Sequence, residues 1–171
     1  MPKRVGIAAA AAVAVLAVVG MVVLAVRIRA DESGIGHLRF GSTQAASAPF
    51  SEFDQARVAI GPQCLRVLVA TTPAQRTQGL RGVRSLQPYA GMLFVEQRDS
   101  SALFTMADTL IPLDITFFGA DGVPVDSTRM TPCPAGTDAT CPTYGSKKPY
   151  RYALERPAGS GSSSGSLSSC A

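Results

Sequence analysis

The chain has 171 residues, of which 46% are hydrophobic and 16% are charged, with a formal net charge of +4. The excess comes from Lys3, Arg4, Arg27 and Arg29, because acidic and basic residues are equal in number over residues 31–171. Nucleic-acid-binding domains usually concentrate positive charge on the folded part, so we expect no nucleic-acid partner. The length fits one domain with additional segments.

Residues 5–26 form an uncharged run of Val, Ala, Leu, Ile, Met and Gly. As a helix this run is long enough to cross a bilayer core of about 30 Å. A cleaved secretory signal has a shorter apolar core, of about 7–15 residues, and a small-residue cleavage site. We therefore predict a single transmembrane signal anchor at residues 5–26, with residues 1–4 in the cytoplasm. A cleaved signal peptide is the alternative.

Residues 27–61 show little hydrophobic periodicity and are interrupted by Gly, Ser and Pro. This composition predicts a flexible stalk between the membrane and a folded domain. The stalk contains the only histidine of the chain, His37. The predicted domain therefore lacks the side chain needed for a His-dependent triad or a His-ligated metal.

Residues 62–159 carry the signals of a folded domain, beginning with a strand over residues 64–71. Thr72 follows as a helix cap, with Pro73 in the first turn and Gln75 at the reciprocal capping position. We expect a short helix through about Gln78, which Gly79 ends.

Alternation of apolar residues predicts five more strands, over residues 92–96, 102–106, 113–118, 123–128 and 150–155. Polar residues 97–100 are expected to form the loop between the first two, and Asp121-Gly122 a tight turn before the fourth. Several short strands with one short helix indicate a mainly β domain, a small barrel or sandwich. Residues 160–171 are mostly Gly and Ser, and we expect a disordered tail.

Cys133 and Cys141 bracket a loop rich in Pro, Gly and Thr. We predict a disulfide between them; a metal site or free thiols are the alternatives, and two cysteines without a nearby histidine make a poor zinc site. Disulfides persist outside the cytoplasm, which favours a single-pass protein with its domain on the extracytoplasmic side of the cell membrane. Pairing of Cys64 with Cys170 would require the tail to fold back, and we do not expect it.

Asp108 and Asp114 are the candidate paired carboxylates of the domain. Asp114 interrupts an apolar run, and a buried carboxylate needs partners, for which Arg76 and Arg84 are the candidates. A structural ion pair, or a carboxylate bonded to backbone amides, is the plainer interpretation of Asp114. The methionines Met92, Met106 and Met130 could bind Cu(I), but core packing is the commoner role of methionine. No metal and no cofactor is predicted.

The segment over residues 67–159 resembles the bacterial and archaeal family called domain of unknown function 192. The resemblance is carried by Gly91-Met92-Leu93-Phe94, by Met106 with Thr109, by Ile111-Pro112-Leu113-Asp114-Ile115 and by Tyr152-Ala153-Leu154-Glu155. It implies a compact, mostly β domain with a short helix. The chain departs from the family pattern at Arg81, where Met is usual, at Asp108, where Asn is usual, and in its Gly/Ser tail.

These observations predict a membrane-anchored extracytoplasmic domain that binds a small ligand or an envelope partner. Arg76, Arg84, Asp108, Thr109 and Asp114 are expected to form or support the site. The alternative is an enzyme that uses Asp108 and Asp114 as acid and base, and a purely structural domain is the third possibility.

Overall fold

The structure is a computed structural model that describes residue 40 and residues 43–134, 138–161 and 165–170. The predicted anchor at residues 5–26 and His37 lie outside the described residues. Within the described ranges, no helix is both long and apolar enough to span a membrane.

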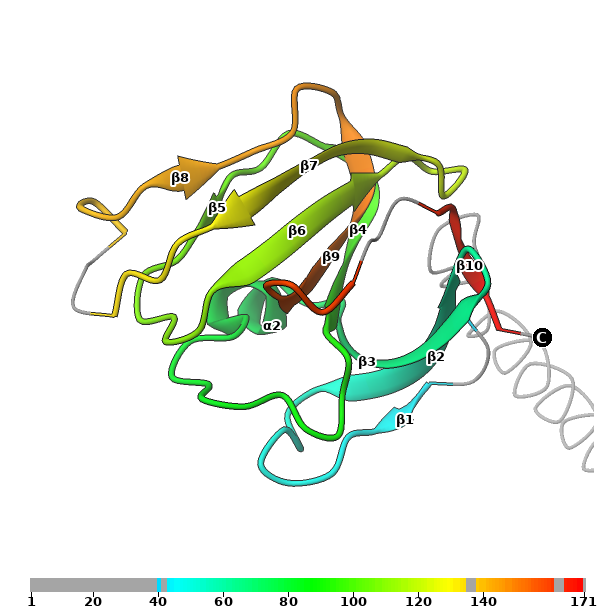
Figure 1. The fold of residues 1–171 in the computed structure, drawn as a ribbon, viewed down its shortest axis with the longest axis horizontal. Coiled ribbons are helices and arrows are strands. Elements are labelled where there is room, and N and C mark those ends of the chain that lie inside the picture. Colours follow the sequence, from blue (N-terminus) through cyan, green and yellow to red (C-terminus); the bar gives the residue numbers. More distant parts are fainter. Residues whose placement is uncertain (1–39, 41–42, 135–137, 162–164, 171) are drawn as a thin grey trace, which may run out of the picture. The chain divides into compact units, whose positions relative to one another are not determined.

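Most described strands belong to one sheet, in the order β1-β2-β3-β4-β9-β6-β7, with β10 also paired to β2 (Figure 1). They are β1 (Gln44–Ala45), β2 (Asp54–Ile60), β3 (Gln63–Ala70), β4 (Met92–Ser100), β6 (Leu113–Phe118), β7 (Pro124–Met130), β9 (Tyr150–Pro157) and β10 (Leu167–Ser169). Neighbours are antiparallel, except that β3 and β4 are parallel. A separate pair joins β5 (Phe104–Thr105) to β8 (Thr143–Tyr144).

The sheet is open, so the prediction of a barrel was wrong, while the mainly β class with one short helix is confirmed. A barrel closes when its first and last strands pair. Here β1 and β10 lie at one end of the strand order and β7 at the other, and in the described residues these ends do not pair.

The single described helix, α2 (Pro73–Gln78), follows its local sequence signals closely. The Thr72 hydroxyl accepts a hydrogen bond from the Gln75 amide, and the Gln75 side chain accepts one from the Thr72 amide, as in a capping box. Gly79 ends the helix with a positive φ, a conformation that costs glycine little. The predicted helix is therefore confirmed together with its caps.

The strand predictions were least accurate where polar residues continue a strand. Residues 97–100, predicted as a loop, are the last residues of β4; the register with β9 shifts after Val95, and Ser100 pairs with Tyr150. Strand β5 is shorter than predicted and belongs to the other sheet. The Asp121-Gly122 turn is present, and it joins β6 to β7.

The second half of the predicted stalk is folded, which corrects the boundary at residue 62. Strand β2 pairs along its whole length with β3, and Val58 is completely buried. Phe50 and Phe53 are also buried, at 4% and 2% exposure. Apolar side chains at irregular spacing gave no periodic signal, but they fill the core beside β3.

The C-terminal tail also differs from the prediction of disorder. Strand β10 pairs with β2, and Leu167 within it is buried at 1% exposure. A disulfide joins Cys64 of β3 to Cys170, a pairing that the sequence did not lead us to expect. Leu167 is the one large apolar side chain of β10, and its burial anchors the strand.

The core consists of two apolar clusters that meet at the central strands. Ala153 belongs to one cluster, with Phe94 and Ile115, whereas Tyr152 and Leu154 belong to the other, with Val67. Successive residues of a strand point to opposite faces, so the two clusters lie on opposite sides of β9. The three methionines considered as copper ligands are completely buried in the first cluster.

Candidate functional site

A cleft opens on the face of the sheet that carries Ala153, beside helix α2; we call it the α2 cleft. Its volume is about 510 Å³, within the range of small-molecule sites. Residues 73 and 76–79 of α2 and its end form one side, and residues 102–105 and Thr143, from the β5–β8 pair and the turn before it, form another. Strands β4 and β9 supply Phe94, Glu96, Tyr150 and Glu155.

Glu155 reaches the cleft from the middle of the sheet. Strand β9 lies between β4 and β6, and Glu155 stands opposite Met92 on one side and Ile115 on the other. The backbones are packed tightly here, because a Cβ atom at Gly91 would overlap the Glu155 carbonyl oxygen. The glycine at the start of β4 thus allows the approach that places Glu155 against the cleft.

The Glu155 side chain is buried and has no partner among the described residues. The residue is 4% exposed, and it makes no side-chain hydrogen bond or ion pair with any residue that the structure describes. Burial alone raises the pKa of its carboxyl group from 4.5 to about 8. Buried polar groups are normally hydrogen-bonded, so an unpaired carboxyl in the wall of a cleft stands out as a group that lacks its partner.

Arg76, one of the predicted site residues, lies in the same cleft. Its guanidinium donates to the carbonyl oxygens of Thr71, at 2.5 Å, and Val95, at 3.2 Å. Its Nε lies 3.4 Å from a carboxylate oxygen of Glu96, and both side chains are largely shielded from solvent. Arg76 thus ties the start of α2 to β4, and its charge is compensated within the domain.

Arg81, which the family resemblance marked as a departure, forms the mouth of the cleft. It pairs with Asp138 at 2.5 Å and with Asp108 at 3.5 Å. It also donates to the carbonyl oxygens of Thr77 and Ala107. Asp108 has a positive φ and donates its amide to the Cys133 carbonyl oxygen. Asp108 therefore supports the mouth through Arg81.

The predicted disulfide between Cys133 and Cys141 is confirmed. It closes the loop that carries Asp138, and an isolated bridge joins Cys133 to Ala107. The disulfide therefore anchors one side of the cleft mouth.

Two further predicted residues lie apart from the cleft floor. Arg84 lines a separate depression of about 440 Å³ that Phe50 and Phe53 also border, and its guanidinium has no partner in the described part of the chain. Thr109 is 4% exposed, and its amide donates to the Met106 carbonyl oxygen. Thr109 supports the turn after Asp108.

Asp114 lies on the other face of the sheet, and its partner is Arg129 rather than Arg76 or Arg84. The Arg129 guanidinium donates to Asp114 at 2.8 and 3.3 Å, and the Gly159 amide donates at 3.0 Å. The hydrogen bond from Arg129 is the main cause that holds the pKa of Asp114 below its usual value. The plainer interpretation of Asp114, a carboxylate in an ion pair and bonded to a backbone amide, agrees with this geometry.

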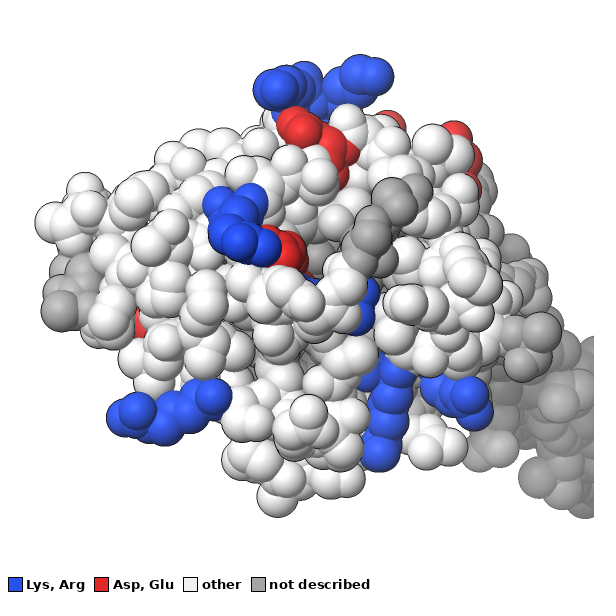
Figure 2. Space-filling model, in the orientation of Figure 1, with Lys and Arg blue, Asp and Glu red and all other residues white. Residues whose placement is uncertain are grey.

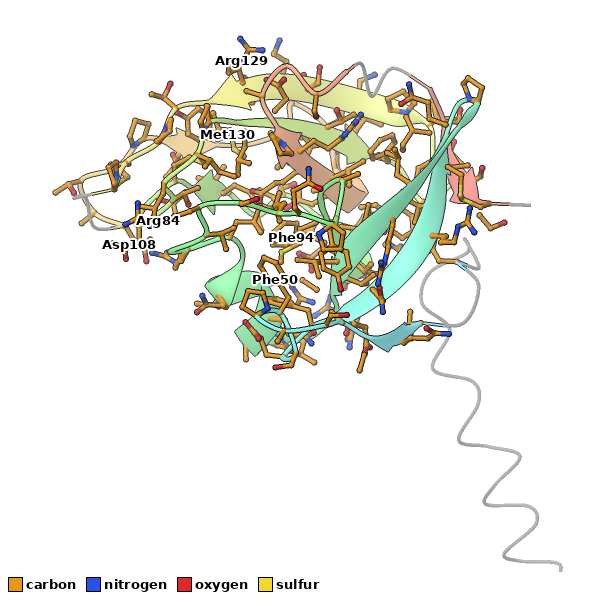
Figure 3. The ribbon with its side chains drawn as sticks, turned by 60° about the horizontal axis from the view of Figure 1, so that its bottom comes forward. Phe50, Arg84, Phe94, Asp108, Arg129 and Met130 are labelled. Carbon is orange, nitrogen blue, oxygen red and sulfur yellow. A yellow bond between two sulfur atoms is a disulfide. The ribbon has the colours of Figure 1, made fainter. Side chains whose placement is uncertain are left out.

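Asp108 and Asp114 do not share a cleft. Figure 3 shows Arg84 and Asp108 toward one end of the domain, and Arg129, the partner of Asp114, well away from both on β7. The face in Figure 2 carries its charged side chains as separate small groups on a largely uncharged surface. The predicted acid–base pair therefore has no common site in the described residues.

Sequence reasoning used Glu155 only as part of the Tyr152-Ala153-Leu154-Glu155 motif and missed it as a site residue. The signal that could have identified Glu155 as a site residue was its position in the predicted strand. In an alternating strand it shares a face with Ala153, so a carboxylate is directed to an inward face. That signal becomes specific only when β9 is known to be a central strand.

Comparisons with known proteins agree with this fold. A model of the family DUF192, described as an uncharacterized ACR, matches residues 56–165, and the chain therefore belongs to this family. A crystal structure of a protein of unknown function from Novosphingobium aromaticivorans is similar with a TM-score of 0.58 and 21% identity, over 75% of this chain and 87% of that one. A putative transcription regulator from Sinorhizobium meliloti is similar with a TM-score of 0.56 and 27% identity, over 74% and 96%. A search of curated proteins gave no match.

Proposed function

We propose that this DUF192 protein is a membrane-anchored extracytoplasmic domain that binds a small ligand in the α2 cleft. The observation that carries the proposal is Glu155, a carboxyl group that is 4% exposed, lines the cleft and has no partner in the described residues. Leaving such a group unpaired costs roughly 1–3 kcal/mol, and a ligand that pairs with it removes that cost.

The walls of the cleft support a small molecule rather than a protein partner. Aromatic rings of Phe94, Phe104 and Tyr150 line it, beside polar side chains of which several are held in hydrogen bonds or ion pairs. The Tyr150 hydroxyl donates to the Ala102 carbonyl oxygen at 3.0 Å, and Arg76 is held by two carbonyl groups. Apolar rings combined with oriented polar groups are typical of small-molecule sites.

The extracytoplasmic location draws support from the cysteines. All four cysteines of the chain are in disulfides, Cys64–Cys170 and Cys133–Cys141. Disulfides of this kind persist in oxidising compartments. Together with the apolar run at residues 5–26, they favour a domain held at the outer face of the membrane.

The description of the Sinorhizobium protein as a putative transcription regulator does not extend well to this chain. Residues 31–171 contain equal numbers of acidic and basic side chains. Neutralising DNA phosphates requires a surplus of Lys and Arg on the binding surface. We therefore keep the small-ligand proposal.

Intact mass spectrometry of the full chain, extracted from its own membranes, tests the proposal. We expect a native mass that exceeds the denatured mass by one small ligand. Ala102→Trp places an indole in the cleft wall and should remove that ligand. Ala74→Trp, on the exposed surface of α2 outside the lining, is the matched control and should retain it. Equal native and denatured masses for the unmodified protein would contradict ligand binding.

A further inference from the structure

The charges of the α2 cleft are paired with one exception. Arg76 lies 3.4 Å from Glu96, and Arg81 lies 2.5 Å from Asp138. Each pair is neutral as a unit. Among the charged residues that line the cleft, Glu155 alone has no counter-ion in the described part of the chain. Once Glu155 ionises, a cation is therefore the group that would complete the charge pairing of the cleft.

Among the described residues that line this cleft, no cationic group is free to bind an anionic ligand. The Arg76 guanidinium already donates to two carbonyl oxygens in addition to its contact with Glu96. The Arg81 guanidinium donates to the Thr77 and Ala107 carbonyl oxygens and contacts two carboxylates. An anion would have to displace these bonds and would also face Glu155.

The apolar part of the wall also suits a cation. The rings of Phe94 and Phe104 pack edge to face with centroids 5.1 Å apart, and Tyr150 lies 6.2 Å from Phe104. Ring faces attract an ammonium group within about 6 Å, by up to about 2 kcal/mol when it is desolvated. A hard metal ion would need several oxygen ligands, and the described residues contain no cluster of three or more acidic, His or Cys side chains.

We propose that the α2 cleft recognises its ligand through a primary ammonium group, which the Glu155 carboxylate binds as its counter-ion. The inference rests on the proposed function, because it names the chemical class of the ligand in the same cleft. The aromatic rings would hold the hydrocarbon part next to the ammonium group.

Binding of an ammonium ion carries a definite proton balance. Burial raises the pKa of Glu155 to about 8, so near neutral pH the carboxyl group of the empty cleft holds its proton. An ammonium group beside it lowers that pKa, and the proton leaves to the buffer while the ligand keeps its own. Affinity for the cation therefore increases as pH rises toward 8 and levels off above it.

Isothermal titration calorimetry of the full chain in detergent, at about pH 6.5, tests this balance with three four-carbon probes that differ in the polar group. The probes are n-butylamine, butyramide and butyrate, titrated in buffers of different ionisation enthalpy. We expect n-butylamine to bind with release of about one proton, and the amide and the acid to bind at least about tenfold more weakly. Glu155→Gln should lower n-butylamine affinity by about tenfold or more and abolish the proton release, whereas Glu52→Gln, at an exposed position, should change neither.

The outcomes separate the two proposals. Binding of butyramide or butyrate in preference to n-butylamine would overturn the ammonium assignment and leave a small-ligand cleft. Equal n-butylamine binding by Glu155→Gln would overturn it as well. No binding of any probe, together with equal native and denatured masses, would overturn both. If Glu155→Gln does not fold, n-butylamine affinity of the unmodified chain that stays constant between about pH 6 and 8 contradicts the assignment.

Discussion

Glu155 and Arg156 are neighbours in sequence and are almost equally buried. In the described residues, the Arg156 side chain has hydrogen-bond partners and the Glu155 side chain has none. Arg156 is 6% exposed and donates to the Ser160 and Gly161 carbonyl oxygens, with Asp114 as a nearby negative charge. Its Nε is the one side-chain nitrogen or oxygen atom in the described residues that is fully enclosed and has no hydrogen-bond partner. Glu155, at 4% exposure, has no side-chain partner in those residues.

The two residues lie on opposite faces of β9, and the faces are closed by different means. The Arg156 face is covered by β2 and by β10, which the Cys64–Cys170 disulfide holds in place. The Glu155 face is covered by α2 and the small β5–β8 sheet (Figure 1), and the α2 cleft remains between them. Glu155 lines this cleft, so a ligand in the cleft can reach its carboxyl group.

The largest expected effect is the loss of stability as Glu155 ionises. The folded state keeps the proton up to a pKa of about 8, while the unfolded state loses it near the ordinary value of 4.5. The free energy of unfolding should therefore fall between these pH values, by on the order of 4–5 kcal/mol. Urea unfolding of the unmodified chain and of Glu155→Gln, at about pH 5, 7 and 9, measures the difference.

Glu155→Gln should not show this loss of stability, because glutamine does not titrate. Glu52→Gln, at an exposed position, should follow the unmodified chain at every pH. Parallel losses in Glu155→Gln and the unmodified chain would show that Glu155 is not the titrating group, and the contrast with Arg156 would fail.

The second effect compares the closures of the two faces. Cys64 and Cys170 are 106 residues apart, whereas Cys133 and Cys141 are 8 apart. The loop-closure model then assigns about 4–5 kcal/mol to the first disulfide and about 2–3 kcal/mol to the second. Urea unfolding of the Cys64→Ser/Cys170→Ser and Cys133→Ser/Cys141→Ser double variants should give this order.

Ligand retention should depend on the Cys133–Cys141 disulfide more than on Cys64–Cys170, the reverse of the order expected for stability. The Cys133–Cys141 disulfide holds the loop of Asp138 at the mouth of the cleft, while Cys64–Cys170 closes the other face. Native mass spectrometry should show that the Cys133→Ser/Cys141→Ser variant loses the ligand and that the Cys64→Ser/Cys170→Ser variant keeps it. The opposite result would mean that the cleft depends on β10.

The smallest effect concerns the ion pair of Asp114, on the Arg156 face. Asp114→Asn should cost about 1 kcal/mol or less, because its side chain is 34% exposed and solvent screens the pair with Arg129. The lowered pKa of Asp114 means that its contribution is complete above pH 3.8 and is lost as pH falls further through the folded-state pKa. Urea unfolding near pH 6 and near pH 2.5 checks both points.

Asp114→Asn should leave binding of n-butylamine unchanged, since Asp114 faces away from the cleft. A loss of binding in this variant, with the fold intact by circular dichroism, would place Asp114 in the site. That result would support the site that the sequence predicted.

Local signals predicted local structure well. Thr72, Pro73, Gln75 and Gly79 lie within eight residues, and together they define α2 with both of its ends. The Asp121-Gly122 turn and the Cys133–Cys141 disulfide also depend on residues close in sequence. Arg76 was predicted as a site residue and does line the cleft, although its partner is Glu96.

Features that depend on distant partners were missed. Nothing near Leu167 indicates a strand, because β10 exists only through its pairing with β2. Phe50 and Phe53 gave no periodic pattern, and Asp114 took Arg129 as its partner because β6 and β7 set the two residues opposite each other.

The sequence by itself determined the family, the mainly β class, the capped helix and the short-range disulfide, since each depends on residues that are neighbours along the chain. Tertiary structure alone decided that the sheet stays open, that Cys170 meets Cys64, and that Glu155 is buried beside a cleft with no partner in the described residues. The physical reason is that burial and pairing of a side chain depend on which strands become neighbours. In β9 that choice gave Arg156 its carbonyl partners and left Glu155 facing the cleft.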